Sequence, residues 1–159
     1  MKLSFIFWVS ILLVSCNQQG NNEKALQKRI DSLEANSYRP GFGEFMSSIQ
    51  IHHSKLWFAG KNQNWKLADF EINEIKENLT DIKKYCADRP ETKSIGMIDQ
   101  SLDSISNAII QKNAALFNSN YTTLTNTCNA CHQATNHEYN VIKIPDNPPF
   151  SNQDFKTNN

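Results

Sequence analysis

The sequence is poor in residues that interrupt helices, because it has 5 glycines and 5 prolines among 159 residues. Runs in which β-branched and polar residues alternate are also scarce, which argues against strands. The long segments between the few breaks are rich in lysine, glutamate, asparagine, leucine and isoleucine, and they favour helices. We therefore expect an all-α fold, with one domain plus appendages at this length.

An excess of charge of one sign is absent as well, because 16 basic residues balance 16 acidic ones. With a net charge of zero, neither a nucleic-acid-binding surface nor a strongly acidic partner surface is indicated, and we expect no nucleic-acid partner. The sequence also lacks a Ser/His/Asp set, a paired carboxylate site and a phosphate-binding loop. We accordingly predict that the protein is not an enzyme.

Apolar runs of membrane-spanning length are also lacking. The run from Leu3 to Val14 follows the basic residue Lys2 and is shorter than the roughly 20 residues that a helix needs to cross a bilayer. It has the form of an export signal, and its end, Leu13-Val14-Ser15-Cys16, resembles the bacterial lipobox. In that class of signals the cysteine is acylated and becomes the first residue of the mature protein. A plain signal peptide with Cys16 at its cleavage site is the alternative.

These features predict a location and the first domain boundaries. Residues 1–15 are the expected lipoprotein signal peptide, and residues 16–40 are a lipidated tether. The tether would anchor the protein to a membrane of the bacterial cell envelope, facing the periplasm. A short helical segment or brief coiled-coil seam is expected inside it, at three apolar residues spaced by four and three: Leu26, Ile30 and Leu33. The oligomeric state is left open, with a homodimer allowed.

The chemistry of the chain is concentrated in one pentapeptide, Cys128-Asn129-Ala130-Cys131-His132. Two cysteines two residues apart, with histidine directly after the second, form the attachment signature of a c-type haem. The sulfurs can form thioether bonds with the haem vinyl groups, and a neutral imidazole is a good axial ligand for haem iron. We predict one covalently bound haem c, with Cys128 and Cys131 as attachment sites and His132 as an axial ligand. Export agrees with this interpretation, because c-type haem is attached outside the cytoplasm in bacteria.

Three other interpretations of the motif stay open. A thioredoxin-like CxxC would open a helix after a strand, and no strand pattern precedes Cys128. A zinc site would recruit His137, although the adjacent Cys131 and His132 fit one tetrahedron poorly. Two unmodified core cysteines are the third interpretation. The remaining cysteine, Cys86, lies on an apolar helix stripe and is expected to be inert.

Four long segments carry apolar residues at intervals of three and four, the pattern of amphipathic helices. We expect helices at residues 42–60, 64–87, 92–117 and 120–137, with a turn at Asn118-Ser119-Asn120. The face of the second helix that includes Glu71 is expected to be solvated. Short turns predict an antiparallel up-down-up-down four-helix bundle over residues 41–137, with haem attached near the end of the last helix. Residues 138–159, a tail with three prolines, are expected to pack along this bundle.

A four-helix bundle with CxxCH near the end of its last helix resembles the class II c-type cytochromes, the cytochrome c-prime-like group. The first two helices are similar to those of a related set of exported bundle cytochromes. There, a methionine and a histidine precede a KLxxAG turn, here Lys55 to Gly60, and an NWxLAxFE start of the second helix, here Asn64 to Glu71. The resemblance covers about residues 41–137 and implies the bundle and the haem. It says little about the partner.

The second axial ligand of the iron decides the chemistry. In an antiparallel bundle the start of the first helix lies beside the end of the last, so the ligand opposite His132 is expected there. Met46 fits this position, whereas His53 lies about 10 Å further along the helix at 1.5 Å per residue. Low-spin members of the resembled group place their ligand at the position of Met46. His53 or His52 as distal ligand, and an open five-coordinate iron, stay open as alternatives.

The predicted function is a membrane-tethered monohaem c-type cytochrome that carries single electrons between redox partner proteins of the cell envelope. The first alternative is a five-coordinate haem protein that binds small gases such as nitric oxide or carbon monoxide. The second is a haemless lipoprotein that serves as an interaction module.

Overall fold

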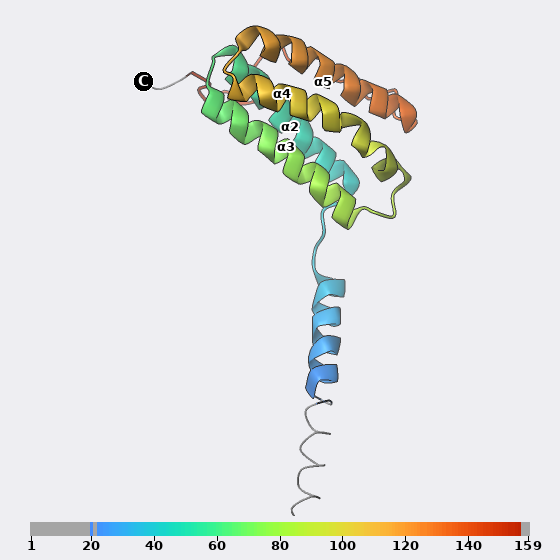
Figure 1. Ribbon diagram of the computed structural model, residues 1–159. Helices are drawn as coiled ribbons and strands as arrows, with labels where there is room; N and C mark the ends of the chain where they lie inside the picture. Colours follow the sequence, from blue (N-terminus) through green and yellow to red (C-terminus); the bar gives the residue numbers. More distant parts are fainter. Residues whose placement is uncertain (1–19, 21, 157–159) are drawn as a thin grey trace, which may run out of the picture. The chain divides into compact units, whose positions relative to one another are not determined.

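The computed structural model describes residues 20 and 22–156, so the predicted signal peptide and Cys16 lie outside the described residues. Within the described part the chain is helical and has no strand (Figure 1), which confirms the all-α class. The chain divides into two compact units, with the boundary between Arg39 and Pro40.

The first unit contains a helix over residues 22–36. Its apolar residues Leu26, Ile30 and Leu33, which are spaced by four and three, are exposed to solvent. Among the residues that the structure describes, no helix is both long and apolar enough to cross a membrane.

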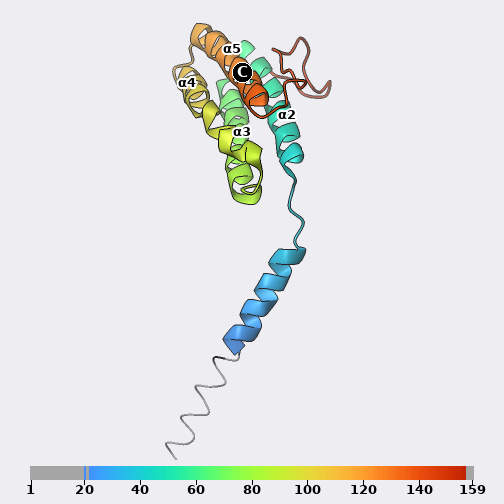
Figure 2. The same cartoon turned by 90° about the vertical axis from the view of Figure 1, so that its right-hand side faces the viewer.

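In the second unit, residues 40–156 contain four α-helices and one 3₁₀ helix. These are α2 (Phe42–Lys61), α3 (Trp65–Tyr85), the 3₁₀ helix η1 (Pro90–Ile98), α4 (Asp99–Ile110) and α5 (Ala114–Ala134). Helix α2 packs against α3 and α5, and α4 packs against α3 and α5 (Figures 1 and 2). Helix η1 lies against α3, α4 and α5.

The third predicted helix, 92–117, is wrong as a single element. A 3₁₀ helix and a shorter α-helix take its place, and the chain reverses at residues 111–113, before α5 begins. Lys112 adopts a left-handed conformation with φ of 52°, which ends α4. The Asn113 side chain then accepts a hydrogen bond from the Leu116 backbone N–H at 3.1 Å and caps the start of α5. The predicted turn at 118–120 therefore lies inside α5.

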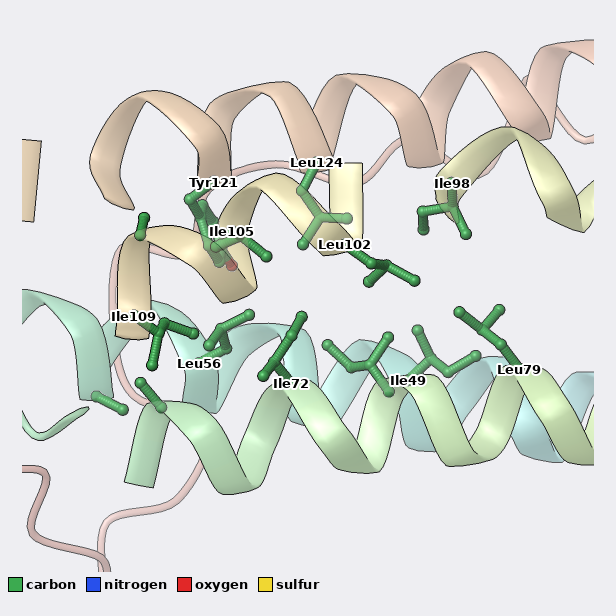
Figure 3. Close-up of a cluster of buried hydrophobic side chains, with 14 of the residues drawn as sticks. Ile49, Leu56, Ile72, Leu79, Ile98, Leu102, Ile105, Ile109, Tyr121 and Leu124 are labelled. Atoms are coloured by element: carbon green, nitrogen blue, oxygen red, sulfur yellow. The ribbon is translucent and has the colours of Figure 1, made fainter. Parts of the chain in front are cut away.

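The core is built from the apolar seams of the helices, whose side chains point toward one another (Figure 3). Isoleucine and leucine dominate it, and several of these side chains are completely buried, among them Leu56, Ile72, Ile82 and Ile105. Burial of one such side chain contributes about 1.5–3 kcal/mol to folding. Cys86 is a free, buried thiol that belongs to this core.

An aromatic cluster fills the core near the turn between α2 and α3. Phe117 and Tyr121 of α5 are fully buried, and Trp57 and Trp65 pack against them with ring centroids 4.8–6.4 Å apart. Gly60 lies directly against the Phe117 ring, because a Cβ atom at this position would be only 2.1 Å from the ring carbons. The glycine permits this close approach of α2 to α5.

Glu71 is buried in the structure, whereas the sequence predicted a solvated position. Only 1 % of the residue is exposed, and its carboxylate lies 2.6 Å from Nδ1 of His52 on α2. A buried carboxylate requires such a partner, since an unpaired charge in the core would be strongly destabilising. The pair therefore joins α2 to α3.

The segment after α5 folds back along α5 and α2 (Figure 2). The Asn129 side chain forms two hydrogen bonds of 2.8 Å with the backbone of Ile142. Farther along, the Lys55 ammonium lies over the Phe150 ring. Phe155 is buried against Phe58, with ring centroids 5.7 Å apart.

Candidate functional site

A pocket of about 300 Å³ lies between the first half of α2, the 3₁₀ helix and the last turns of α5. This volume is at the lower end of the range of ligand pockets in proteins, about 300–1,000 Å³. The lining includes apolar side chains from three helices, such as Phe42, Ile95 and Leu79. It also includes every residue predicted at the haem: Met46, Cys128, Cys131 and His132, as well as the alternative ligand His53.

The spacing of the pentapeptide places its three chemical groups on one face of α5. Residues three and four apart are neighbours on a helix surface, so Cys128 shares this face with Cys131 and His132. Both thiols are free and half-buried. The Cys131 thiol lies 3.8 Å from the Ser94 carbonyl oxygen on η1, to which it donates a weak hydrogen bond.

The environment keeps both thiols protonated at neutral pH. Burial raises the pKa of Cys128 to about 12, with a further contribution from Cys131. Burial also raises the pKa of Cys131. In reactive CxxC motifs of redox proteins the pKa of the attacking thiol is lowered, because the thiolate is the nucleophile. The raised pKa values of Cys128 and Cys131 therefore argue against a reactive redox pair.

His132 is oriented by the backbone that follows α5. Its Nδ1 lies 2.6 Å from the carbonyl oxygen of Asn140, so Nδ1–H donates a hydrogen bond to that oxygen. The neutral tautomer then carries its lone pair on Nε2, which is the atom left to bind a metal. The same turn is fixed by a hydrogen bond of 2.7 Å from the His137 N–H to the His132 carbonyl. His132 could thus bind a metal ion through Nε2.

His53 lines the pocket, but both of its ring nitrogens already have partners. Nε2 lies 3.0 Å from the Thr125 hydroxyl, and Nδ1 lies 2.9 Å from the Tyr121 hydroxyl. Burial lowers the pKa of His53 to about 4, so the ring is neutral at pH 7. The Tyr121 hydroxyl also donates to the His53 carbonyl oxygen at 2.8 Å, so this one side chain contacts both the ring and the backbone of His53. Iron binding by His53 would break one of these bonds.

Met46 offers a thioether to the pocket from the second turn of α2. It is half-buried and packs against the core. His52, the neighbouring alternative, points instead to α3, where it is paired with Glu71. The structure therefore brings Met46 and His132 to one pocket and directs His52 elsewhere.

The four ligands of the zinc hypothesis do not gather around one point. His137 lines the pocket, but its Nδ1 bonds to the Thr135 carbonyl at 2.7 Å, and its Nε2 faces Glu91 at 4.0 Å. Within residues 22–156, no three histidine, cysteine or acidic side chains form a group that could hold a metal ion.

Two charged residues of the pocket were missed from the sequence. Arg89 donates two hydrogen bonds to Glu91, at 2.8 and 3.2 Å, and both residues line the pocket. A backbone hydrogen bond and the hydrogen bond from Arg89 lower the pKa of Glu91, which therefore stays ionised. The only local signal was their position on either side of Pro90, which marks a helix start but not a pocket.

Comparisons of the chain with protein-family models, with curated proteins and with solved structures found no match.

Proposed function

We propose that the protein is a monohaem c-type cytochrome that carries single electrons in the bacterial cell envelope. One observation carries the proposal: the two cysteines and the histidine of the CxxCH motif line the same pocket as Met46. The side chains match the group, since a c-type haem with His/Met coordination requires two thiols for covalent attachment, and an imidazole and a thioether as iron ligands. The orientation of His132 adds support, because its Nε2 is left for the iron.

The proposal includes an antiparallel up-down-up-down arrangement of α2, α3, α4 and α5, with the haem near the end of α5. Met46 in the second turn of α2 and His132 in the last turn of α5 border one pocket. At the other ends of these two helices, Trp57 and Phe117 have ring centroids 6.4 Å apart. Both observations support the proposal that α2 and α5 run in opposite directions.

Met46 is the distal ligand in this proposal. The competing residue His53 is held by Tyr121 and Thr125 on α5, and one of these hydrogen bonds would be lost if it bound iron. A methionine ligand raises the reduction potential of a haem and leaves no open position for a gas. Electron transfer therefore follows more directly from this pocket than gas binding does.

The haem, once bound, supplies the one-electron couple of its iron. The chain's own residues bind, orient and shield it. Cys128 and Cys131 would hold it covalently, and apolar side chains that line the pocket, such as Ile95 and Ile98, would exclude water. Arg89 and Glu91 line the pocket as an ion pair, so together they bring no net charge to it.

The location in the proposal rests on the sequence alone. The apolar run before Cys16 and the lipobox-like end predict export and a lipid anchor. A cytochrome tethered in this way would exchange electrons with redox partner proteins of the envelope.

The proposal is tested by expressing the full chain in a bacterial host that matures c-type cytochromes and measuring the intact mass. We expect the mass of one haem in addition to the chain and its lipid. Replacing both motif cysteines, Cys128→Ser with Cys131→Ser, should abolish the addition. Cys86→Ser is the matched control and should retain it, because Cys86 is not among the residues that line the pocket. A wild-type chain that is exported without haem would contradict the proposal and favour the haemless interaction module.

A further inference from the structure

Asn129, the first of the two residues between the motif cysteines, links the axial histidine to the chain that follows α5. Its side-chain amide donates to the Ile142 carbonyl and accepts from the Ile142 N–H, both at 2.8 Å. Two residues earlier, the Asn140 carbonyl accepts the hydrogen bond from His132 at 2.6 Å. One side chain on α5 thus fixes the backbone segment that orients a neighbouring side chain on the same helix.

We propose that Asn129 is a positioning residue that clamps residues 140–142 and thereby sets the hydrogen bond and the ligand strength of His132. This inference rests on the proposed function, since it assigns a control of the same haem site. The segment is held farther along by Lys55 at Phe150 and by the burial of Phe155. Asn140 and Ile142 also line the pocket, so the clamp holds one side of the pocket closed.

The physical reason lies in the basicity of the imidazole. A hydrogen bond from the second ring nitrogen to a carbonyl raises the basicity of a ligating histidine. A more basic ligand stabilises ferric iron relative to ferrous iron, so it lowers the reduction potential. The Asn140 carbonyl can act in this way only while residues 140–142 stay in place. Release of the clamp should therefore raise the potential of the haem.

The test compares Asn129→Ala with Asn126→Ala in the full chain. Asn126 is an exposed asparagine almost one turn earlier on α5, and it makes a matched control. The first measurement is the hydrogen-exchange rate of the Ile142 amide. We expect this rate to rise about tenfold or more in Asn129→Ala. The second is the midpoint potential of the loaded protein, which we expect to shift to more positive values. Asn126→Ala should change neither.

A second variant, Ile142→Pro, removes the same N–H group from the other side and should shift the potential in the same direction. If Asn129→Ala does not fold, the potential of Ile142→Pro decides whether the clamp acts on the haem. An unchanged exchange rate of Ile142 in Asn129→Ala would overturn the clamp. Faster exchange with an unchanged potential would overturn its link to His132. A wild-type chain without haem would overturn the proposed function and with it this link, while the exchange rate would still decide whether the clamp exists.

Discussion

Phe117, Tyr121 and Leu124 in the first half of α5 have at most 1 % of their surface exposed, whereas Cys128, Cys131 and His132 in the second half are only half-buried. Both sets lie on one continuous seam with spacings of three and four. In the first half of α5 these side chains pack against aromatic rings and against Gly60 of α2. In the second half it borders a pocket of about 300 Å³.

One half of α5 is therefore tightly packed, and the other half borders the pocket in which we propose that the cofactor binds. Aromatic side chains fill the space between α2 and α5 near the α2–α3 turn, where packing is tight. Smaller cysteine side chains leave space at the other end, which a large, flat cofactor could occupy. Stability should therefore depend mainly on the first half, and cofactor binding on the second.

Loss of an aromatic ring in the first half of α5 should have the largest effect on the stability of the fold. Phe117→Ala should lower the free energy of unfolding by about 3–5 kcal/mol, because it removes a fully buried ring and leaves a cavity. Leu116→Ala, at the exposed neighbouring position, should cost less than about 1 kcal/mol. Urea unfolding of both variants measures the difference. Equal costs would show that the first half is not the tightly packed end.

Acid should destabilise the fold through His53 of α2, which contacts Tyr121 and Thr125 near the middle of α5. Its pKa is about 4 in the folded chain and about 6.5 when unfolded. Between these values the unfolded chain binds a proton that the folded chain does not, so stability is complete above about pH 6.5 and falls as the pH drops toward 4. The loss should reach about 3 kcal/mol.

The measurement is urea unfolding at several pH values between 4 and 7, for the wild type and His53→Gln. The substitution should remove most of this slope, since glutamine does not titrate. A slope that persists unchanged in His53→Gln would assign the pH dependence to other groups.

A methyl group at the close contact of α2 and α5 should have a smaller effect. Gly60→Ala should cost about 1–3 kcal/mol, because its Cβ would meet the Phe117 ring and force one helix to move. Gly43→Ala adds the same group to α2 where nothing lies within 4 Å. It should be neutral or stabilise by about 0.5 kcal/mol. Thermal unfolding of the pair tests this, and a harmless Gly60→Ala would disprove the close approach.

Met46→Ala should have the smallest effect on folding and a large one on the haem. Met46 borders open space and is half-buried, so its truncation should cost only about 1 kcal/mol in the chain without haem. In the loaded protein the iron should change from low to high spin. Met97→Ala, at an exposed position, should leave the spin state unchanged. Absorption spectra of the two variants decide this point, and a low-spin Met46→Ala would exclude Met46 as the ligand.

Hydrophobic spacing predicted the helical class and the first two helices of the domain, but not the reversal after α4. Expected ranges of 42–60 and 64–87 compare with Phe42–Lys61 and Trp65–Tyr85. At the reversal, a lysine rather than a glycine adopts the left-handed conformation, so the usual signal for a helix end is missing. The cap by Asn113 could have been found, because asparagine before an apolar run is a common start of a helix.

The site was predictable where it depends on local spacing. The interval of three and four residues alone places Cys128, Cys131 and His132 on one face of α5. Asn129 could not be assigned a role in this way, because its partner is a backbone group 13 residues away. The contribution of Arg89 to the pocket depends on the path of η1, which the sequence did not reveal. Long-range contacts to backbone atoms leave no periodic pattern.

The central claim is tested most directly by absorption spectra of the full chain, oxidised and reduced, after maturation in a host that attaches c-type haem. We predict a sharp α-band in the reduced protein and the weak far-red band of methionine-ligated iron in the oxidised protein. Absence of haem absorption would contradict the claim outright. A broad high-spin spectrum that shifts on addition of carbon monoxide would keep the haem, contradict Met46 as its ligand and favour gas binding.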